Sequence, residues 1–336
     1  MKRRDLIMTA ALAPLLAAPR VAQAGLLPII EEAASLDPLR SVAMWCDDES
    51  GGQEIAAQGF HGATPDTPTN IKSASKSIIS AMVGIAIGHG LLEGTDQPIA
   101  PLLRPDLPAD PDPRLMQITL GQLLSMQAGL ERQSGPNYGR WVSSGNWVKA
   151  ALAAPFTQDP GGTMQYSTAS SHLVAAILTR VTGRPLLDVA RDWLGQIPGF
   201  RITGWDRDPQ GIYMGGNQMA MTTRSLLAFG ATYARQGQAA GRQVIPKSWI
   251  HDSWQRQTTS VFTGQAYGYG WFLGRIGGRP MRCGWGYGGQ MIYVFPATFT
   301  HPAMAIAITS NPDQPSSHNG YRIELNRLAD RMVRAV

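Results

Sequence analysis

The chain has 336 residues, of which 43% are hydrophobic and 16% are charged, and it contains two cysteines. This length allows one large domain or two modest ones, and the composition excludes collagen-like, disordered and disulfide-stapled proteins. The formal net charge is +5, but only five of the 29 basic residues are lysines, and no run of four basic residues occurs. Because nucleic-acid-binding surfaces carry clustered basic residues, we expect no nucleic-acid partner.

The first 24 residues have the pattern of an export signal. A basic start at residues 2–4 precedes an apolar stretch over residues 6–18, and residues 22–24 form a small-x-small cleavage site. The paired Arg3 and Arg4 favour a twin-arginine signal, with an ordinary secretory signal as the alternative. The apolar stretch is shorter than the about 20 residues that span a bilayer, so we expect no permanent membrane span. We expect the export machinery to bind this segment and a periplasmic or secreted protein to begin at Gly25.

The sequence after this signal begins with strands and then becomes helical. Two short strands are expected over residues 41–46 and 52–56. From Ser73 apolar residues recur at helical spacing as far as Ala86, and glycines follow. Residues 101–113 contain five prolines and are expected to form a surface loop. Thr119, with Gln122 three residues later, is a capping box that predicts the start of the next helix.

Strands return in the last hundred residues. Further helices are expected over residues 170–181, 186–194 and 222–236, then strands over 267–273, 289–296 and 303–310, and a last helix over 321–333. Strands at both ends around a helical middle predict an α/β (α+β) fold, in which helices flank an antiparallel sheet and an all-helical domain is inserted. We assign residues 25–72 and 237–336 to the sheet domain and residues 73–236 to the mainly helical domain, with the active site at their interface.

Several common catalytic motifs are absent from the sequence. The six histidines are scattered singly, without an HExxH pair or a cysteine-rich spacing, so a zinc site is not expected. There is no Gly-x-Ser-x-Gly elbow and no phosphate-binding loop, which disfavours an α/β-hydrolase and a nucleotide enzyme.

Ser73 and Lys76 form the first candidate catalytic pair. Residues three apart on a helix have Cβ atoms about 5–6 Å from each other, which brings a hydroxyl and an amine within working distance. A serine becomes a nucleophile when a base takes its proton, and a lysine can be that base when burial lowers its pKa. No other lysine here has a serine three residues before it, and apolar residues follow Lys76. The alternative is a helix cap with a solvated lysine.

Tyr166 and a glycine-rich segment supply the other candidate groups. A lysine ammonium near Tyr166 would favour the phenolate form, which could relay a proton, whereas the alternative is a packing tyrosine. Residues 283–290 contain four glycines among eight residues. Glycines in a strand allow backbone N–H groups to approach a ligand, as an oxyanion hole requires, and the alternative is a bulged hairpin without a catalytic role.

Together these groups resemble the serine hydrolases of the β-lactamase and penicillin-binding-protein superfamily. The similar branch holds class C β-lactamases, related esterases and 6-aminohexanoate-dimer hydrolases. The resemblance covers about residues 70–310 and rests on Ser73 to Lys76 and on residues 118–124, 129–130, 160–161, 166–167, 221–224, 229–230 and 284–290.

The resemblance implies a role for each candidate residue. Ser73 is then the acylated nucleophile, Lys76 its proton acceptor and Tyr166 the base or relay. The backbone N–H groups of Ser73 and Tyr287 form the oxyanion hole. The substrate contacts come from Trp285, Gly286, Gly288 and Arg282.

The resemblance also implies a sheet whose first strand neighbours the last, with the strand of Gly284 three places away. At about 4.8 Å per strand, this order separates Cys46 from Cys283 by roughly 14 Å, which exceeds the limit of about 7 Å for a disulfide. Export would permit a bridge, but we expect none.

Two positions depart from the pattern of the superfamily. Thr168 stands where the tyrosine motif usually has an asparagine, so the carboxamide that recognises a substrate amide is missing. Gly284 stands where lactamases and peptidoglycan peptidases have a cation for the substrate carboxylate. Arg282, two residues earlier on the same strand face, is the second-best candidate for that role. Aromatic residues that suit an apolar acyl or alcohol group, or form sheet core, lie nearby: Tyr267, Tyr269, Trp271, Trp285 and Tyr287.

The sequence therefore predicts a periplasmic serine hydrolase that forms an acyl-enzyme with a small-molecule ester or amide and requires no metal or organic cofactor. It would be a carboxylesterase or resemble the 6-aminohexanoate-oligomer hydrolases. A β-lactamase and a peptidoglycan DD-peptidase are the alternatives among enzymes. A non-catalytic sensor or binding protein for cell-wall fragments is the alternative outside enzymes.

Overall fold

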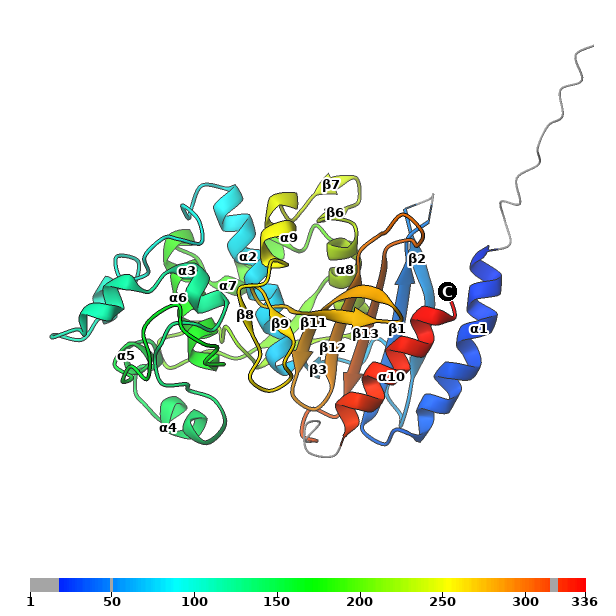
Figure 1. Cartoon of the computed structure of the whole chain (residues 1–336), viewed down its shortest axis with the longest axis horizontal. Coiled ribbons are helices and arrows are strands. Elements are labelled where there is room, and N and C mark those ends of the chain that lie inside the picture. The colour runs from blue at the N-terminus through cyan, green and yellow to red at the C-terminus, as the bar shows by residue number, and fades with distance from the viewer. Residues whose placement is uncertain (1–17, 49–50, 315–319) are drawn as a thin grey trace, which may run out of the picture.

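An eight-stranded antiparallel sheet forms one side of the molecule (Figure 1), and the computed structural model describes residues 18–48, 51–314 and 320–336. The strands are hydrogen-bonded in the order β2-β1-β13-β12-β11-β10-β9-β8. Their bounds are β1 Leu39–Cys46, β2 Gln53–Gly59, β8 Thr258–Thr259, β9 Ala266–Tyr267, β10 Phe272–Ile276, β11 Arg279–Gly286, β12 Gln290–Phe295 and β13 Met304–Ser310. The predicted fold class, an antiparallel sheet flanked by helices, is confirmed.

The first strand lies beside the last, as the resemblance implies. β1 pairs with β13, with Val42 opposite Ile308, and β11 lies three places from β1. Cys46 on β1 and Cys283 on β11 are both free thiols, so the prediction that no disulfide joins them is confirmed. Burial raises the pKa of Cys46 to about 11 and that of Cys283 to about 12, so both thiols stay protonated at neutral pH.

Both faces of the sheet are buried, and side chains alternate between them. On β13, Met304 and Ile306 belong to one apolar cluster, whereas Ala305 and Ala307 belong to the other. The first face packs against α1 (Ala18–Glu32) and α10 (Tyr321–Arg334), and the second packs against α8 (Thr223–Ala234) and α2 (Ser75–Gly88), as Figure 1 shows. The second of these clusters includes residues of both the sheet and α2, so α2 is packed directly on the sheet.

Helices within residues 120–193 form most of the other side of the molecule, and a further short helix and a hairpin lie beside α2 and α8 (Figure 1). The helices are α3 Leu120–Leu124, α4 Tyr138–Val142, α5 Trp147–Leu152, α6 Thr168–Thr182, α7 Leu186–Trp193 and α9 Lys247–Ser253. The minor sheets are β3 Thr69–Asn70 with β5 Met219–Met221 and β4 Ile202–Trp205, and the hairpin β6 Gln238–Ala239 with β7 Arg242–Gln243. The capping box of Thr119 and Gln122 is present at the start of α3, as predicted.

Two regions differ from the sequence-based expectation. The strand expected over residues 267–273 is broken, because β9 ends at Tyr267 and β10 begins at Phe272. The reason lies in two glycines: Gly270 has φ +82°, and a Cβ on Gly268 would lie 2.2 Å from the carbonyl oxygen of Ser253. In addition, α8 packs on strands β1, β12 and β13, although its residues fall in the range predicted for the helical domain.

The predicted export signal lies mainly outside the described residues, which begin at residue 18. α1 starts at Ala18 and continues through the predicted cleavage site after Ala24. Among the described helices, none combines the length and the apolar character that crossing a membrane requires.

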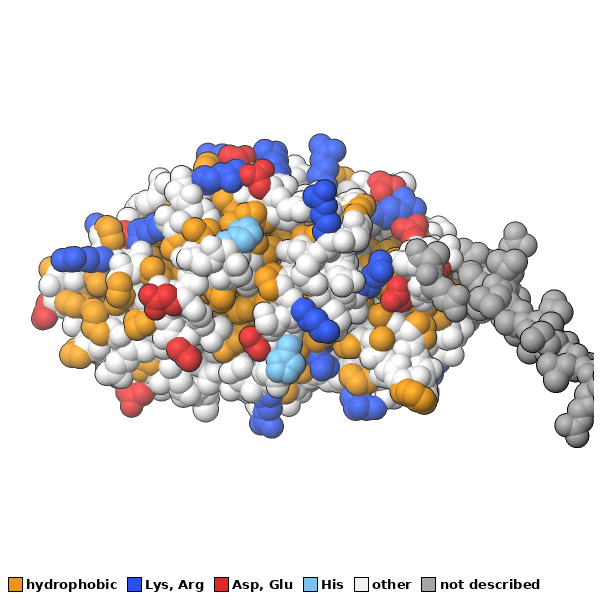
Figure 2. Space-filling view, turned by 90° about the horizontal axis from the view of Figure 1, so that it is seen from above, with side chains coloured by type: hydrophobic (Ala, Val, Ile, Leu, Met, Phe, Trp, Pro, Cys, Tyr) orange, Lys and Arg blue, Asp and Glu red, His pale blue; other side chains and the backbone are white. Residues whose placement is uncertain are grey.

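The face seen in Figure 2 carries mixed charges. Lys and Arg side chains are scattered there among Asp, Glu, neutral and hydrophobic ones, and no broad patch of one sign is visible on this face. This distribution agrees with the absence of basic runs in the sequence.

Candidate active site

Ser73 lies in a 3₁₀ turn, Lys72–Ala74, that leads directly into α2. The preceding Lys72 has φ +49°, a left-handed conformation that is unfavourable for a side chain with a Cβ. The turn is held from both sides, since the Lys72 N–H donates to Asn70 Oδ1 at 2.9 Å and the Ile71 N–H donates to the Met219 carbonyl at 2.8 Å. Ser73 remains half-buried and reachable, at the positive end of the helix dipole.

Lys76 points from the first turn of α2 toward Ser73. Its Nζ donates to Ser73 Oγ at 3.0 Å and to the Gly216 carbonyl oxygen at 2.7 Å. The residue is only 3% exposed, and no carboxylate pairs with it among the described residues. Burial therefore lowers the pKa of Lys76 to about 7. A substantial fraction of this lysine is neutral near pH 7, and a neutral amine is what a base for Ser73 requires.

Tyr166 completes a group of three polar side chains. It hydrogen-bonds with Ser73, and Lys76 Nζ lies 5.1 Å from the centroid of its ring. Burial outweighs the hydrogen bond and raises the pKa of Tyr166 to about 12. The sequence-based expectation that a nearby lysine favours the phenolate is outweighed by burial, which is the largest influence on the pKa of Tyr166.

The carbonyl group of Gly216 belongs to a tightly anchored segment between β4 and β5. Asp208 Oδ1 accepts from the backbone N–H groups of residues 210 and 212 at 2.8 Å each. Its Oδ2 lies 2.9 Å from Nε2 of the buried His172 on α6. A Cβ on Gly216 would lie 2.8 Å from Thr168 Cγ2 and 3.0 Å from Lys76 Nζ, so any other residue would require one of these side chains to move. The segment thus fixes the second hydrogen-bond acceptor of the lysine.

The end of β11 lies against the turn that carries Ser73. A Cβ on Gly286 would lie 2.2 Å from the Ile71 carbonyl oxygen and 3.2 Å from the Ala74 nitrogen, so only glycine fits. Tyr287 follows directly, with its side chain exposed. The structure therefore brings the residue before Tyr287 beside the turn that carries Ser73. This is the arrangement that an oxyanion hole needs.

The two departures from the superfamily pattern have structural explanations. Thr168 begins α6, and its Oγ1 lies 2.9 Å from Ser134 Oγ, which also accepts from the Thr168 N–H at 2.8 Å. The hydroxyl group of Thr168 is thus hydrogen-bonded to Ser134. A Cβ on Gly284 would lie 2.7 Å from Ser77 Oγ, which in turn donates to the Gly270 carbonyl. Ser77 therefore excludes a side chain, and with it a cation, from position 284.

Three other residues proposed from the sequence have contacts in the structure with residues outside the group of Ser73, Lys76 and Tyr166. The guanidinium of Arg282 lies over the Trp254 ring, with Cζ 5.3 Å from its centroid, and donates to the Met281 carbonyl. A Cβ on Gly288 would lie 2.6 Å from the Asn311 carbonyl oxygen, so this glycine packs against the loop after β13. Trp285 packs between Phe272 and Arg322.

The aromatic residues of this region are divided between core and site. Trp271 is fully buried against Tyr233, and Tyr269 stacks on Trp249 at 5.7 Å. Tyr267 is buried too, but its ring contacts Tyr166 edge to face at 6.4 Å. Of these rings, Tyr267 is the one that supports the site.

Three contributors to the site were not found by sequence reasoning. Gly216 acts through its carbonyl, which every residue type has, so no residue signal could identify it. Phe262 contacts the Tyr166 ring at 6.2 Å, and the Arg132 guanidinium lies over Phe262. The Gln133 N–H donates to Ser167 Oγ at 3.0 Å, which holds the segment of Arg132 beside Tyr166. The position of Gly129-Leu130 just before Arg132 was the one signal available.

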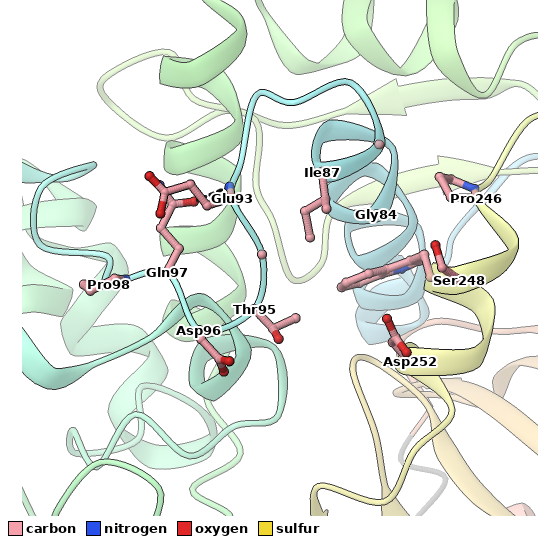
Figure 3. A pocket seen from close by; sticks show the side chains of 13 residues that line it. Gly84, Ile87, Glu93, Thr95, Asp96, Gln97, Pro98, Pro246, Ser248 and Asp252 are labelled. Carbon is pink, nitrogen blue, oxygen red and sulfur yellow. Dashed lines mark hydrogen bonds between the residues drawn. The ribbon is translucent and has the colours of Figure 1, made fainter.

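A pocket of about 460 Å³ lies at the other end of α2 (Figure 3). Its lining includes Gly84 and Gly88 of the helix and the carboxylates of Glu93, Asp96 and Asp252. It does not include Ser73, Lys76 or Tyr166. Among the described residues, no group of three or more His, Cys, Asp or Glu side chains is arranged to hold a metal ion.

The chain is similar in sequence to known proteins. The family model described as Beta-lactamase matches residues 49–331. The fimbrial assembly protein FimD, serogroup H1, of Dichelobacter nodosus is 30% identical over 188 residues, which are 52% of this chain and 45% of that protein. The 6-aminohexanoate-dimer hydrolase of Paenarthrobacter ureafaciens is 24% identical over 313 residues, which are 83% of this chain and 77% of that enzyme.

A solved structure confirms the fold over nearly the whole chain. EstCE1, described as a hydrolase with promiscuous acyltransferase activity, superimposes with a TM-score of 0.72 at 17% identity and covers 93% of this chain and 99% of its own. By contrast, the present chain matches less than half the length of the fimbrial protein.

Proposed function

This chain belongs to the beta-lactamase family, and we propose that it is a serine hydrolase that forms an acyl-enzyme with an ester or a small amide. The observation that carries the proposal is the buried Lys76, whose Nζ lies 3.0 Å from Ser73 Oγ and whose pKa is lowered to about 7. A buried lysine without a carboxylate partner destabilises the fold, so its place beside an accessible serine favours a catalytic role over a structural one.

In the proposed acylation step, neutral Lys76 takes the proton of the Ser73 hydroxyl while Oγ attacks the substrate carbonyl carbon. The N–H groups of Ser73 and Tyr287 hold the resulting oxyanion. The intermediate collapses when the bond to the alcohol or amine breaks, and the leaving group takes a proton from the Tyr166 hydroxyl. The Lys76 ammonium then returns a proton to Tyr166, so both residues regain their starting forms.

Deacylation follows the same route with water in place of the alcohol. Lys76 takes a proton from the water molecule, whose oxygen attacks the acyl carbon. The bond from that carbon to Ser73 Oγ breaks, the serine recovers its proton from Lys76, and the carboxylic acid leaves. Each cycle consumes one ester or amide bond and one water molecule.

The preference for esters and small amides over β-lactams rests on two residues. Gly284 has no cation for the carboxylate of a β-lactam or peptide, and Ser77 leaves no space for one. Thr168 is bonded to Ser134 and provides no carboxamide. The similarity to a 6-aminohexanoate-dimer hydrolase and to EstCE1 supports the same substrate class.

The test is the variant Ser73→Ala measured against Ser75→Ala. Ser75 lies two residues away, and its buried hydroxyl has no partner, so its removal should leave activity intact. We expect Ser73→Ala to lower kcat for p-nitrophenyl butyrate by at least about 10⁴-fold. Mass spectrometry of the wild type should find the acyl group on Ser73. Unchanged turnover by Ser73→Ala, or an acyl group on Ser75, would refute the proposal.

Two further probes distinguish the alternative functions. Rapid labelling by a fluorescent penicillin, without a burst of p-nitrophenol from esters, would indicate a β-lactamase or a DD-peptidase. Failure of a fluorophosphonate to label Ser73 would indicate a non-catalytic sensor or binding protein. We expect ester bursts and fluorophosphonate labelling.

We also propose that the protein is exported and works in the periplasm. The support is the basic start, apolar stretch and small-x-small site within residues 1–24. N-terminal sequencing of the protein from the source cell envelope should begin at Gly25. Changing Arg3 and Arg4 to lysines should block export if the twin-arginine route is used. Recovery of an envelope protein that begins at Met1 contradicts the proposal.

A further inference from the structure

Arg132 is a cation near Tyr166 of the candidate active site. Its Cζ lies 5.3 Å from the centroid of the Phe262 ring, and that ring contacts Tyr166 edge to face at 6.2 Å. The next residue, Gln133, is bonded to Ser167, the neighbour of Tyr166. The contact with Phe262 thus holds the Arg132 guanidinium, and the bond of Gln133 to Ser167 holds the backbone next to it near Tyr166.

This guanidinium has unused hydrogen-bond donors. Of the ion pairs that the described residues form, none includes Arg132. The adjacent Glu131 is paired with Arg140 at 2.5 Å, and Arg132 Nε is buried without a partner. An arginine presents five N–H donors in a planar fork that matches a carboxylate. Arg132 Nε is covered by the protein, so an anionic ligand would bind to the terminal nitrogens Nη1 and Nη2, which form no hydrogen bond or ion pair with the described residues.

Other cations near the site have a hydrogen-bond or ion-pair partner, although the Nε atoms of Arg282 and Arg322 are buried without one, as is that of Arg132. Arg282 lies over Trp254, and Arg322 lies over Trp285 while donating to Gln265 Oε1 at 2.6 Å. Lys72 faces Asp313, with 3.7 Å between nitrogen and oxygen. Position 284 cannot carry a side chain beside Ser77. Among these cations, Arg132 is the one whose guanidinium forms no hydrogen bond or ion pair with the described residues, and it lies over the ring that contacts Tyr166.

The residues around Arg132 also indicate the chemistry of the substrate segment between its anionic group and the carbonyl that Ser73 attacks. Phe262 is 52% exposed and Val261 is 64% exposed, both in the connection between β8 and β9. Exposed apolar side chains beside a catalytic tyrosine offer a surface for a short apolar chain. Phe262 thus has one contact with Tyr166, one with Arg132 and a free surface for substrate.

We propose that the substrates are esters or small amides that carry a second, free carboxylate, and that Arg132, supported by Phe262, binds this carboxylate as a specificity residue. The proposal rests on the proposed hydrolase function of Ser73. It places substrate-charge recognition on the segment after Leu130 rather than on β11. The apolar spacer between the two carbonyl carbons lies along Phe262.

A matched pair of substrates tests the proposal. The mono-p-nitrophenyl ester of adipic acid carries a free carboxylate, and its methyl ester is neutral with the same chain. A second pair places the charge on the leaving group: the butyrate ester of 4-hydroxybenzoate and that of methyl 4-hydroxybenzoate. We expect wild type to prefer the anionic member of at least one pair by about tenfold or more in kcat/KM. Equal kcat/KM values within both pairs would overturn the proposal.

Variants then assign the preference to a residue. Arg132→Gln should lose about tenfold in kcat/KM on the preferred anionic substrate and change little on its neutral partner, and Arg132→Lys should restore part of the loss. Arg256→Gln is the matched control, because Arg256 is exposed, lies near β8, bonds only to Thr259 and carries the same charge. If Arg322→Gln abolishes the preference and Arg132→Gln retains it, the assignment to Arg132 is wrong.

Two controls separate failure of this proposal from other failures. Thermal unfolding and fluorophosphonate labelling of Arg132→Gln show whether the fold and Ser73 are intact. If Arg132→Gln does not fold, Phe262→Leu provides the second test, since it removes the ring under the guanidinium at an exposed position and should weaken the charge preference. Wild type that hydrolyses none of the four esters refutes the hydrolase function, whereas wild type that hydrolyses them without charge preference refutes only the role of Arg132.

Discussion

The two ends of α2 differ in the way that matters for catalysis. At the N-terminal end, Ser73, Lys76 and Tyr166 are in mutual contact, and burial lowers the pKa of the lysine to about 7. At the C-terminal end, a pocket of about 460 Å³ is lined by three carboxylates, of Glu93, Asp96 and Asp252. All three of these residues are exposed.

The contrast shows that an open volume does not by itself locate chemistry. An exposed carboxylate keeps its water shell, whereas a buried amine loses it and becomes a base at neutral pH. The catalytic end of the helix is therefore the one with a desolvated group beside a reachable hydroxyl.

Replacing Lys76 should separate activity from stability. We expect Lys76→Met to lower kcat for p-nitrophenyl butyrate by about 10³-fold, since a general base contributes about 10² to 10⁴. The same variant should be more stable than wild type, because a buried amine with a pKa of about 7 instead of 10.5 destabilises the fold by at most about 5 kcal/mol. Steady-state kinetics and urea unfolding measure the two effects.

The sign of the stability effect depends on pH. Between about pH 7 and 10.5 the unfolded chain binds more protons at this lysine than the folded chain, so wild-type stability rises with pH in that window. The advantage of Lys76→Met should thus be larger at pH 6 than at pH 9. Lys149→Met, at an exposed position on α5, is the control and should show neither effect. A variant that loses stability at both pH values would contradict the account.

The pH dependence of kcat/KM should distinguish the lysine from the tyrosine as the base. If neutral Lys76 is the base, the rate rises about tenfold per pH unit below 7 and levels off above it. If the Tyr166 phenolate is the base, the rate keeps rising toward its pKa of about 12. We expect kcat/KM to level off above pH 7. We expect Tyr166→Phe to be slower by about 10²-fold but to show the same rise of kcat/KM below pH 7.

Gly216→Ala should show how closely the lysine is held. The new Cβ would lie 3.0 Å from Lys76 Nζ and 2.8 Å from Thr168 Cγ2, so the amine or its carbonyl acceptor must move. We expect kcat to fall by about tenfold, in line with the sensitivity of catalysis to small misplacements. Gly204→Ala is the matched control, because its Cβ would make only an ordinary contact of 3.6 Å with Ala220. Equal kcat values for both variants would exclude a positioning role for Gly216.

Local patterns in the sequence predicted much of the fold. The capping box of Thr119 and Gln122, the strands at both ends and the last helix all depend on residues that are close in sequence, and the structure has them. The break after Tyr267 was missed because aromatic residues favour a strand there. Tertiary contact with Ser253 decides that segment, and a single sequence does not contain that information.

The candidate site was predictable only where its members are neighbours or carry distinctive side chains. Ser73 and Lys76 lie three residues apart, so their contact follows from helix geometry. The Gly216 carbonyl reaches Lys76 across 140 positions and has no side chain to reveal it. The position of Arg132 near Tyr166 depends on the bond between Gln133 and Ser167. These are contacts between distant segments, which only the folded chain brings together.

The smallest effect is expected at the C-terminal end of α2. Asp252→Asn and Asp96→Asn each remove an exposed charge from the pocket in Figure 3, far from the lysine in sequence and without contact to it. Because exposed charges interact weakly through water, we expect kcat/KM for p-nitrophenyl butyrate to stay within about twofold of wild type. Measured between pH 5 and 9, kcat/KM of both variants should rise up to about pH 7 and then level off, as in wild type. A tenfold loss in either variant would mean that this pocket takes part in the reaction, and the two ends of α2 would then have to be regarded as one site.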